Sequence, residues 1–335
     1  MKSEHPEPVS EAGDLEKSPG GRAHEEALHA LLEQTRLPKD EVSARLESAL
    51  SEAYWLSLCP QLTLGGGRVS TSREVADIDA QCLSDLLKKF AREGYFQTAP
   101  LFSSVTVDRM AECIGVLRAA DWPPVFAFVY DEFWEVTRGT GLSALLSAAL
   151  GADYRQLPHV WAHYVSRRGG AGWPPHTDSR RKVNRITVWV ALSNATLDNG
   201  CIYLIPKNMA PEAIVRDFGR LQSLGIGDAK SLMQRSRALP APAGTVLGWG
   251  HDVIHWGAAC GPSGETRISI SQEFVSGGVS APGGETLLLD AQRLPSFTER
   301  LRVVAKAIVA YQGFEPLTIR FLELAERLLD RVPVE

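Results

Sequence analysis

The sequence predicts a mainly β core flanked by helices, an α+β chain. Between residues 159 and 276 apolar residues come in short β-branched and aromatic runs separated by Gly, Pro, Asn and Asp, a pattern typical of strands. On both sides of this region apolar residues recur at three- and four-residue spacings, which favours amphipathic helices. Because helices do not alternate with the short runs, we expect an antiparallel sandwich or barrel.

Each expected element has a local signal. The helices are expected at residues 23–34, 39–53, 79–94, 104–124, 139–151, 296–313 and 316–331. The strands are expected at residues 159–167, 185–194, 201–206, 244–250, 252–259 and 266–276. Gly94 is a helix stop signal, and a proline pair closes the helix at 104–124.

The same patterns divide the chain into regions. They predict a disordered tail (1–22), a helical N-terminal region (23–84), a β core (85–280) with a lid-like insertion at 208–237, and C-terminal helices (281–335). The terminal helices are amphipathic and could form a homodimer interface.

Composition excludes several classes of function. The chain has 335 residues and a formal net charge of −5, which gives no electrostatic reason to bind nucleic acid. No apolar run approaches the roughly 20 residues of a membrane span, and the polar start does not resemble a signal peptide. The five cysteines are scattered without a CxxC pair, so we expect free thiols and a cytoplasmic location.

The stretch "PPHTDSRR" (174–181) suggests a metal site. On a strand, residues i and i+2 face the same side, so His176 and Asp178 could present an imidazole and a carboxylate to one ion. A third ligand must come from elsewhere, and His251 and His255 are the downstream candidates. Two histidines and one carboxylate leave open positions on a metal and are the ligand set of non-haem Fe(II) oxygenases.

The strand "TRISISQEF" (266–274) carries what an oxoacid bound to such a metal would need. Its alternation places Arg267, Ser269 and Ser271 on one face and apolar residues on the other. A guanidinium holds a carboxylate with two hydrogen bonds, and a neighbouring hydroxyl adds a donor. A polar inner face and an apolar outer face fit a barrel that has its site inside and helices packed outside.

The run from HTD through "TVWVALSNATLDNGCIYLIP" to "APAGTVLGWGHDVIHWGAACGPSGETRISIS" resembles the phytanoyl-CoA dioxygenase family of Fe(II)/2-oxoglutarate oxygenases. The likeness covers roughly residues 85–276 and implies a double-stranded β-helix, a cupin-like jelly roll with flanking helices.

The resemblance also implies roles for particular residues. It assigns Fe(II) to His176, Asp178 and His255, with the spacing from Gly244 selecting His255 over His251. The cosubstrate 2-oxoglutarate would contact three further residues: Arg267, Ser269 and Trp189.

Three positions depart from the family pattern. The usual "PGSH" after the NGC strand reads "PKNM" (206–209), and Gly257 replaces a serine that often helps to bind 2-oxoglutarate. The basic residue frequent on the strand before HxD has no clear match, and we interpret His159 and His163 on that strand as buried, hydrogen-bonded histidines.

The expected activity is O2-dependent hydroxylation of an unactivated C–H bond in a small-molecule metabolite, with release of succinate and CO2. Desaturation is also compatible, whereas related halogenases have a small residue in place of Asp178. The basic run 179–185, with Arg180 and Arg181, is either a contact for an acidic substrate or a solvated loop. The alternatives are a hydroxylase of peptide or protein side chains and, in a different class, a catalytically silent β-helix scaffold.

Overall fold

The computed structural model describes residues 36–65, 76–167, 169–179, 184–210, 226–278 and 288–332. The expected tail (1–22), the expected helix at 23–34 and the middle of the insertion (211–225) lie outside the described residues. Arg180 and Arg181 also lie outside them, so their role stays a prediction from the sequence.

Two antiparallel sheets form the β core, as the sequence predicted. The larger sheet has the strand order β1-β6-β3-β8-β2-β9 and the smaller one the order β5-β4-β7. The strands are β1 (Tyr95–Pro100), β2 (Arg155–Val165), β3 (Arg185–Ala191), β4 (Ile202–Leu204), β5 (Arg237–Leu239), β6 (Thr245–Gly250), β7 (His255–Gly257), β8 (Arg267–Val275) and β9 (Leu289–Asp290). Six of them lie within the predicted strands or overlap them, whereas β1, β5 and β9 were not predicted.

Helices precede, interrupt and follow the strands. The α-helices are α2 (Lys39–Ala49), α3 (Glu52–Leu58), α4 (Ala80–Glu93), α5 (Ser104–Ala119), α6 (Glu132–Glu135), α7 (Thr140–Leu150), α9 (Ile226–Arg235), α10 (Phe297–Tyr311) and α11 (Leu322–Arg331). The 3₁₀ helices are η1 (Pro124–Val129), η2 (Lys207–Met209) and η5 (Pro316–Phe321). In the described residues no helix is long and apolar enough to cross a membrane.

Three predicted helices are wrong in detail. The helix expected at 104–124 ends at Ala119, and the proline pair begins the 3₁₀ helix η1 instead of closing α5. The helix expected at 39–53 is interrupted after α2, because the Ser51 side chain accepts a hydrogen bond from the Tyr54 backbone N–H (3.2 Å) and caps α3. The helix expected at 316–331 starts as the 3₁₀ helix η5, which has Pro316 in its first turn. Gly94 ends α4 as predicted, with a left-handed φ of 79°.

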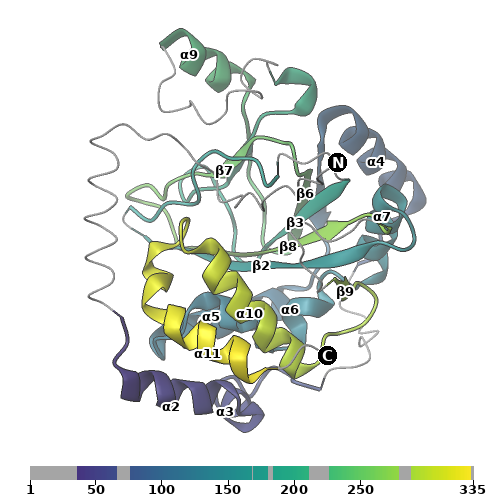
Figure 1. The fold of residues 1–335 in the computed structure, drawn as a ribbon. Coiled ribbons are helices and arrows are strands. Elements are labelled where there is room, and N and C mark those ends of the chain that lie inside the picture. The colour runs from purple at the N-terminus through teal and green to yellow at the C-terminus, as the bar shows by residue number, and fades with distance from the viewer. Residues whose placement is uncertain are drawn as a thin grey trace, which may run out of the picture.

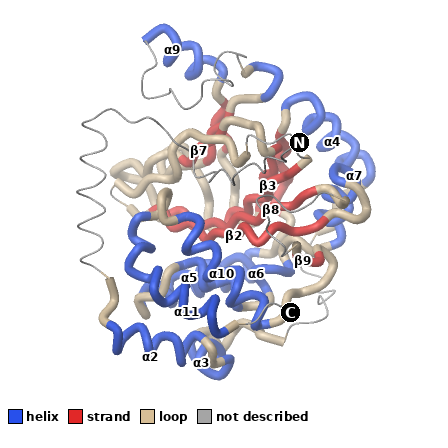
Figure 2. Tube along the Cα trace, in the orientation of Figure 1, coloured by secondary structure: helices blue, strands red, loops and turns tan. Residues whose placement is uncertain are grey.

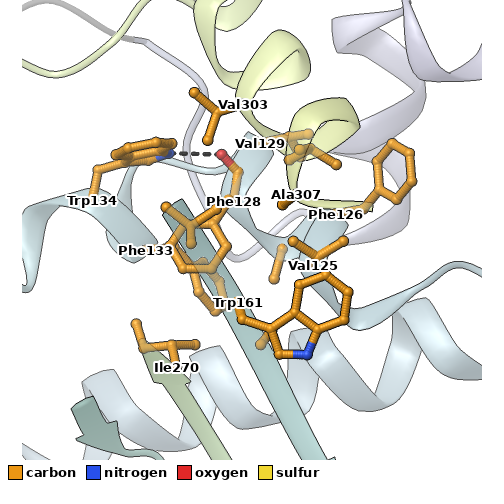
Figure 3. Packing of buried hydrophobic residues seen from close by; sticks show 14 of the residues in the cluster. Val125, Phe126, Phe128, Val129, Phe133, Trp134, Trp161, Ile270, Val303 and Ala307 are labelled. Atoms are coloured by element: carbon orange, nitrogen blue, oxygen red, sulfur yellow. Dashed lines mark hydrogen bonds between the residues drawn. The ribbon is translucent and has the colours of Figure 1, made fainter. Parts of the chain in front are cut away.

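Helices cover one face of the larger sheet, and the smaller sheet lies on its other side (Figures 1 and 2). Helix α10 packs on β2 and η1, and α11 packs on α10. Figure 3 shows the apolar core of this layer, where Phe128, Phe133 and Trp134 meet Val303 of α10 and Ile270 of β8. Burial of these large side chains holds the sheet and helices together.

The alternation predicted for β8 is confirmed. Ile270 and Phe274 belong to the core beneath the helices, whereas Arg267, Ser271 and Glu273 line a pocket on the other face. Gln272, which lies between Ile270 and Phe274 on the core face, is buried in a polar network. This network connects β8 to β2, to α6 and to the loop after α6. This network fixes the position of β8 and thus of its pocket-facing side chains.

A buried ion pair positions the C-terminal helix α10. Arg300 is fully buried, and its Nη1 lies 2.5 Å from Asp131 Oδ1, just before α6. The other oxygen of Asp131 accepts hydrogen bonds from Thr63 Oγ1 (3.0 Å) and from the Gly65 N–H (2.8 Å). The segment that ends at residue 65 and helix α10 are therefore joined through one carboxylate. Tyr311, the last residue of α10, lines the pocket.

Candidate metal centre

The two histidines predicted as ligands lie directly opposite each other. His176 and His255 form an isolated antiparallel β-bridge, in which each backbone N–H donates to the other residue's carbonyl at 3.0 Å. Asp178 follows in a bend. The prediction that His176 and Asp178 lie on a regular strand is therefore wrong, since a single bridge to β7 holds this segment.

The three side chains nevertheless converge. One ligand atom from each of His176, Asp178 and His255 lies within 4.8 Å of the other two, whereas His251 is not part of this group among the described residues. Asp178 Oδ1 is 3.6 Å from His176 Nε2 and 3.5 Å from His255 Nε2. The site thus offers two imidazole nitrogens and one carboxylate oxygen close together, and this donor set is suited to Fe(II).

Backbone carbonyls fix which nitrogen each histidine presents. Nδ1 of His176 lies 2.7 Å from the Pro174 carbonyl, and Nδ1 of His255 lies 3.0 Å from the Val253 carbonyl. A carbonyl can only accept, so each Nδ1 carries the proton and each Nε2 keeps its lone pair. Such hydrogen bonds orient metal-ligating histidines.

The two oxygens of Asp178 have different surroundings. Oδ2 accepts hydrogen bonds from Thr187 Oγ1 (2.6 Å) and from Trp249 Nε1 (2.9 Å), whereas Oδ1 faces the two histidines. Hydrogen bonds therefore hold Oδ2 in place, and Oδ1 is the oxygen available to bind an ion. Burial raises the pKa of Asp178, but His255, His176 and the Thr187 hydroxyl outweigh it and hold the pKa well below its usual range.

Removing the Thr187 hydroxyl is expected to weaken iron binding. A Thr187→Val variant keeps the side-chain shape but removes one of the two hydrogen bonds to Oδ2 of Asp178, which should lower Fe(II) affinity roughly 10–100-fold, as for other partners of metal ligands. Metal titration of the purified variant measures this. Thr245→Val is the matched control, because the buried Thr245 hydroxyl has no hydrogen-bond partner among the described residues. Equal affinity in the two variants would contradict the assigned role of Thr187.

The metal-free protein is expected to lose stability on mild acidification. Burial lowers the pKa of His255 from about 6.5 to about 4, and the Asp178 carboxylate only partly offsets this. The unfolded chain thus binds a proton between pH 6.5 and pH 4 that the folded chain does not, so the free energy of unfolding falls as the pH decreases through this window. The full difference is roughly 3 kcal/mol.

Urea unfolding at pH 7 and pH 5 tests this pH dependence. A His255→Gln variant lacks the titrating group and should show a smaller loss between the two pH values. A variant that loses as much stability as the wild type would show that other groups dominate.

Arg267 and Trp189, two of the three residues expected to hold 2-oxoglutarate, line the same pocket as the metal ligands. Arg267 is 1% exposed, and its Nε and Nη1 have no hydrogen-bond partner among the described residues. The same is true of Ser269 Oγ and Trp189 Nε1, and the guanidinium lies 5.8 Å from the centre of the Trp189 ring. Burial lowers the pKa of Arg267 to about 10, so the side chain stays charged at neutral pH. These unpartnered donors fit a ligand that carries a carboxylate.

Gly257 has a structural reason to replace a serine. A Cβ on Gly257 would lie 2.9 Å from the Gly172 Cα and 3.3 Å from Arg267 Nη2. The close approach of the two backbones therefore excludes a larger side chain beside Arg267.

The pocket also contains residues that sequence patterns did not assign to it. His163 Nε2 lies 3.1 Å from Ser271 Oγ, and burial with the nearby Arg267 charge lowers the His163 pKa, which keeps the imidazole neutral. The further lining residues include Thr187, Trp249, Trp173, Glu273 and Tyr311. Strand alternation could have indicated His163 and Glu273, since both face inward with Ser269 and Ser271. No local signal places Tyr311 here.

The Phytanoyl-CoA dioxygenase (PhyH) family matches residues 90–261, about half of the chain. No curated protein sequence matches the chain.

Solved structures with a similar fold include the non-heme alpha ketoglutarate dependent epimerase SnoN from nogalamycin biosynthesis, at 17% identity over 65% of this chain and 99% of that one, with a TM-score of 0.49. The nickel complex of the non-heme monooxygenase ThoJ shows 17% identity over 70% and 100%, with a TM-score of 0.49. EctD from S. alaskensis, crystallised with 2-oxoglutarate and 5-hydroxyectoine, shows 15% identity over 69% and 94%, with a TM-score of 0.46.

Proposed function

The chain belongs to the phytanoyl-CoA dioxygenase family of Fe(II)- and 2-oxoglutarate-dependent oxygenases, and on this premise we propose that it hydroxylates an unactivated C–H bond of a small-molecule metabolite. His176, Asp178 and His255 would hold the iron through two Nε2 atoms and one carboxylate oxygen. Arg267 would hold the distal carboxylate of 2-oxoglutarate, assisted by Ser269 and Trp189. When bound, iron and 2-oxoglutarate supply O2 activation, with release of succinate and CO2.

The chain's own residues prepare this chemistry. The backbone bridge between His176 and His255 brings the two imidazoles together before any ion binds. Thr187 and Trp249 hold one oxygen of Asp178 and leave the other for the metal. The rings of Trp249 and His255 lie 4.5 Å apart, and burial of this side of the site excludes water from the ligands.

The buried Nε and Nη1 of Arg267, which have no hydrogen-bond partner among the described residues, are the observation that carries the proposal. Burial of a charged group with donors left unpaired is costly, and a ligand that supplies the missing acceptors removes this cost. A catalytically silent scaffold would have no use for such a group. Arg267 and Glu273 both line the pocket but lie six residues apart on β8, so they can contact different molecules.

The turn after α10 lies against the metal-binding segment, and this supports a small substrate rather than a peptide. The ring of Phe314 stacks on Trp173 at 4.8 Å and lies 5.4 Å from the ring of His176. Glu315 accepts a hydrogen bond from Trp173 Nε1 at 2.8 Å, which holds the turn after α10 against the metal-binding segment. An extended peptide would need an open groove where this turn lies.

The cytoplasmic location and the homodimer expected from the sequence are also part of the proposal. All five cysteines are free thiols, which is compatible with a reducing cytoplasm. A homodimer formed through the terminal helices stays a prediction from the sequence.

Anaerobic titration with Fe(II) and 2-oxoglutarate tests the proposed function. The chelate of the two should give a visible charge-transfer band, and admission of O2 should then give succinate, with a higher yield when a true substrate is present. Absence of the band in protein with verified iron content would contradict the proposal. Succinate that forms equally in the Asp178→Ala variant would do the same.

A further inference from the structure

The pocket has a second polar group beside the metal centre, far along β8 from Arg267. Glu273 lies on the same face of β8 as Arg267, six residues farther along the strand, in the part of β8 that pairs with β3. Six residues of strand span roughly 20 Å, whereas a five-carbon diacid is shorter than two residues of extended chain, roughly 7 Å. A 2-oxoglutarate molecule held at Arg267 therefore cannot reach Glu273.

Glu273 is nevertheless close to the metal ligands. Its partner across the β3–β8 pairing is Thr187, and Thr187 donates a hydrogen bond to Asp178. Side chains directly opposite on one face of a sheet have Cβ atoms about 5 Å apart. Glu273 therefore faces the pocket beside the metal centre, where a substrate must place the bond that reacts.

The carboxylate of Glu273 is held in place but can still accept further hydrogen bonds. It is 7% exposed and forms an ion pair with Arg185 through Oε2, which also lies 3.4 Å from His159 Nδ1. The contact of Oε1 with the Tyr311 hydroxyl is a long one of 3.5 Å. Because a carboxylate has about four lone-pair sites, Oε1 keeps room for a further donor.

We propose that Glu273 Oε1 and the Tyr311 hydroxyl form a substrate subsite that binds a hydrogen-bond donor of the substrate, either a hydroxyl or an amine. This inference rests on the proposed function and specifies its substrate class. The positive charge of Arg185 is paired with Glu273 and does not face the pocket as a free cation. The pocket surface at this point therefore presents a hydrogen-bond acceptor. A substrate carboxylate would meet the Glu273 carboxylate here and bind poorly.

Three matched fragments test the proposal: cyclohexylamine, cyclohexanol and cyclohexanecarboxylate share a ring and differ in the polar group. Saturation-transfer NMR on the protein loaded with redox-silent Zn(II) and excess 2-oxoglutarate measures their affinity, with Arg267 occupied by the cosubstrate. We expect the amine and the alcohol to bind, and the carboxylate to bind at least about tenfold more weakly. A preference for the amine over the alcohol identifies a cationic donor, and equal affinity identifies a neutral one.

Variants separate this subsite from general damage. Glu273→Gln should weaken the amine about tenfold, and Tyr311→Phe, which removes only a hydroxyl and spares the buried ion pair, should weaken it about threefold. Glu265→Gln, at an exposed carboxylate two residues before β8, is the matched control and should bind like the wild type.

The outcomes distinguish the two proposals. Equal binding of all three fragments, no binding of any, or unchanged binding in both variants would overturn the subsite while the Fe(II)–2-oxoglutarate band still forms in the wild type. Absence of that band would overturn the proposed function and the subsite with it.

Discussion

Replacing Asp178 by alanine is expected to abolish succinate formation and to weaken Fe(II) binding by at least roughly 10²-fold. Loss of a hydrogen-bond partner of a metal ligand already costs about 10–100-fold, and this variant removes the ligand itself. It also removes the negative charge that faces both imidazoles and leaves the donors of Thr187 and Trp249 without their acceptor. Metal titration and succinate assays of the purified variant measure the two effects.

Asp252→Ala is the matched control for this variant. Asp252 lies three residues before His255, but its carboxylate is at the surface in an ion pair with Lys207 (2.7 Å), and an exposed pair of this kind contributes little to stability. The control should therefore bind iron and release succinate like the wild type. Wild-type turnover in Asp178→Ala would exclude the assigned metal centre, whereas equal loss in both variants would point to general unfolding.

Strand alternation explains why much of the site could be predicted from the sequence. One face of β8 carries Arg267, Ser269 and Ser271. Because side chains alternate between the two faces of a strand, these three residues share a face regardless of how the rest of the chain folds. The same rule applied to β2 would have placed His163 beside Ser269, its partner across the sheet. That inference needs the strand pairing, which the sequence does not contain.

Other parts depend on contacts between residues far apart in the chain. Trp173 and Glu315 are 142 residues apart and hydrogen-bonded, so no local pattern indicates that the turn after α10 lies over the metal-binding segment. The periodicity of α10 predicted a helix, but not its contacts with distant residues such as the ion pair of Arg300 with Asp131. Because the position of the end of α10 depends on such contacts, Tyr311 was absent from the expected site.

Some local expectations were overridden by tertiary structure. His176 and Asp178 converge as predicted, yet a single backbone bridge to β7 and the Pro174 carbonyl hold them instead of a strand ladder. Arg185 ends the basic run 179–185 and begins the predicted strand 185–194, and it does lie on β3. Its charge was not expected to be buried, yet it is 7% exposed and paired with Glu273 inside the β core.

Replacing Arg267 by methionine is expected to move two measured quantities in opposite directions. The affinity for 2-oxoglutarate should fall roughly 10²–10³-fold, because two hydrogen bonds between charged groups are lost. The metal-free protein should become more stable by about 1–4 kcal/mol, since an unbranched apolar side chain replaces a buried charge that has unpartnered Nε and Nη1 atoms. Titration of the Fe(II)–2-oxoglutarate band and urea unfolding measure the two quantities.

Arg267→Lys separates charge from geometry. It keeps the positive charge but lacks the planar fork, so its 2-oxoglutarate affinity should fall between those of the wild type and Arg267→Met, without the gain in stability. Unchanged affinity in Arg267→Met would exclude the carboxylate-binding role. A methionine variant less stable than the wild type would mean that the guanidinium is satisfied in the metal-free protein. A stable variant that no longer binds 2-oxoglutarate would show that Arg267 is retained for its ligand at a cost to the fold.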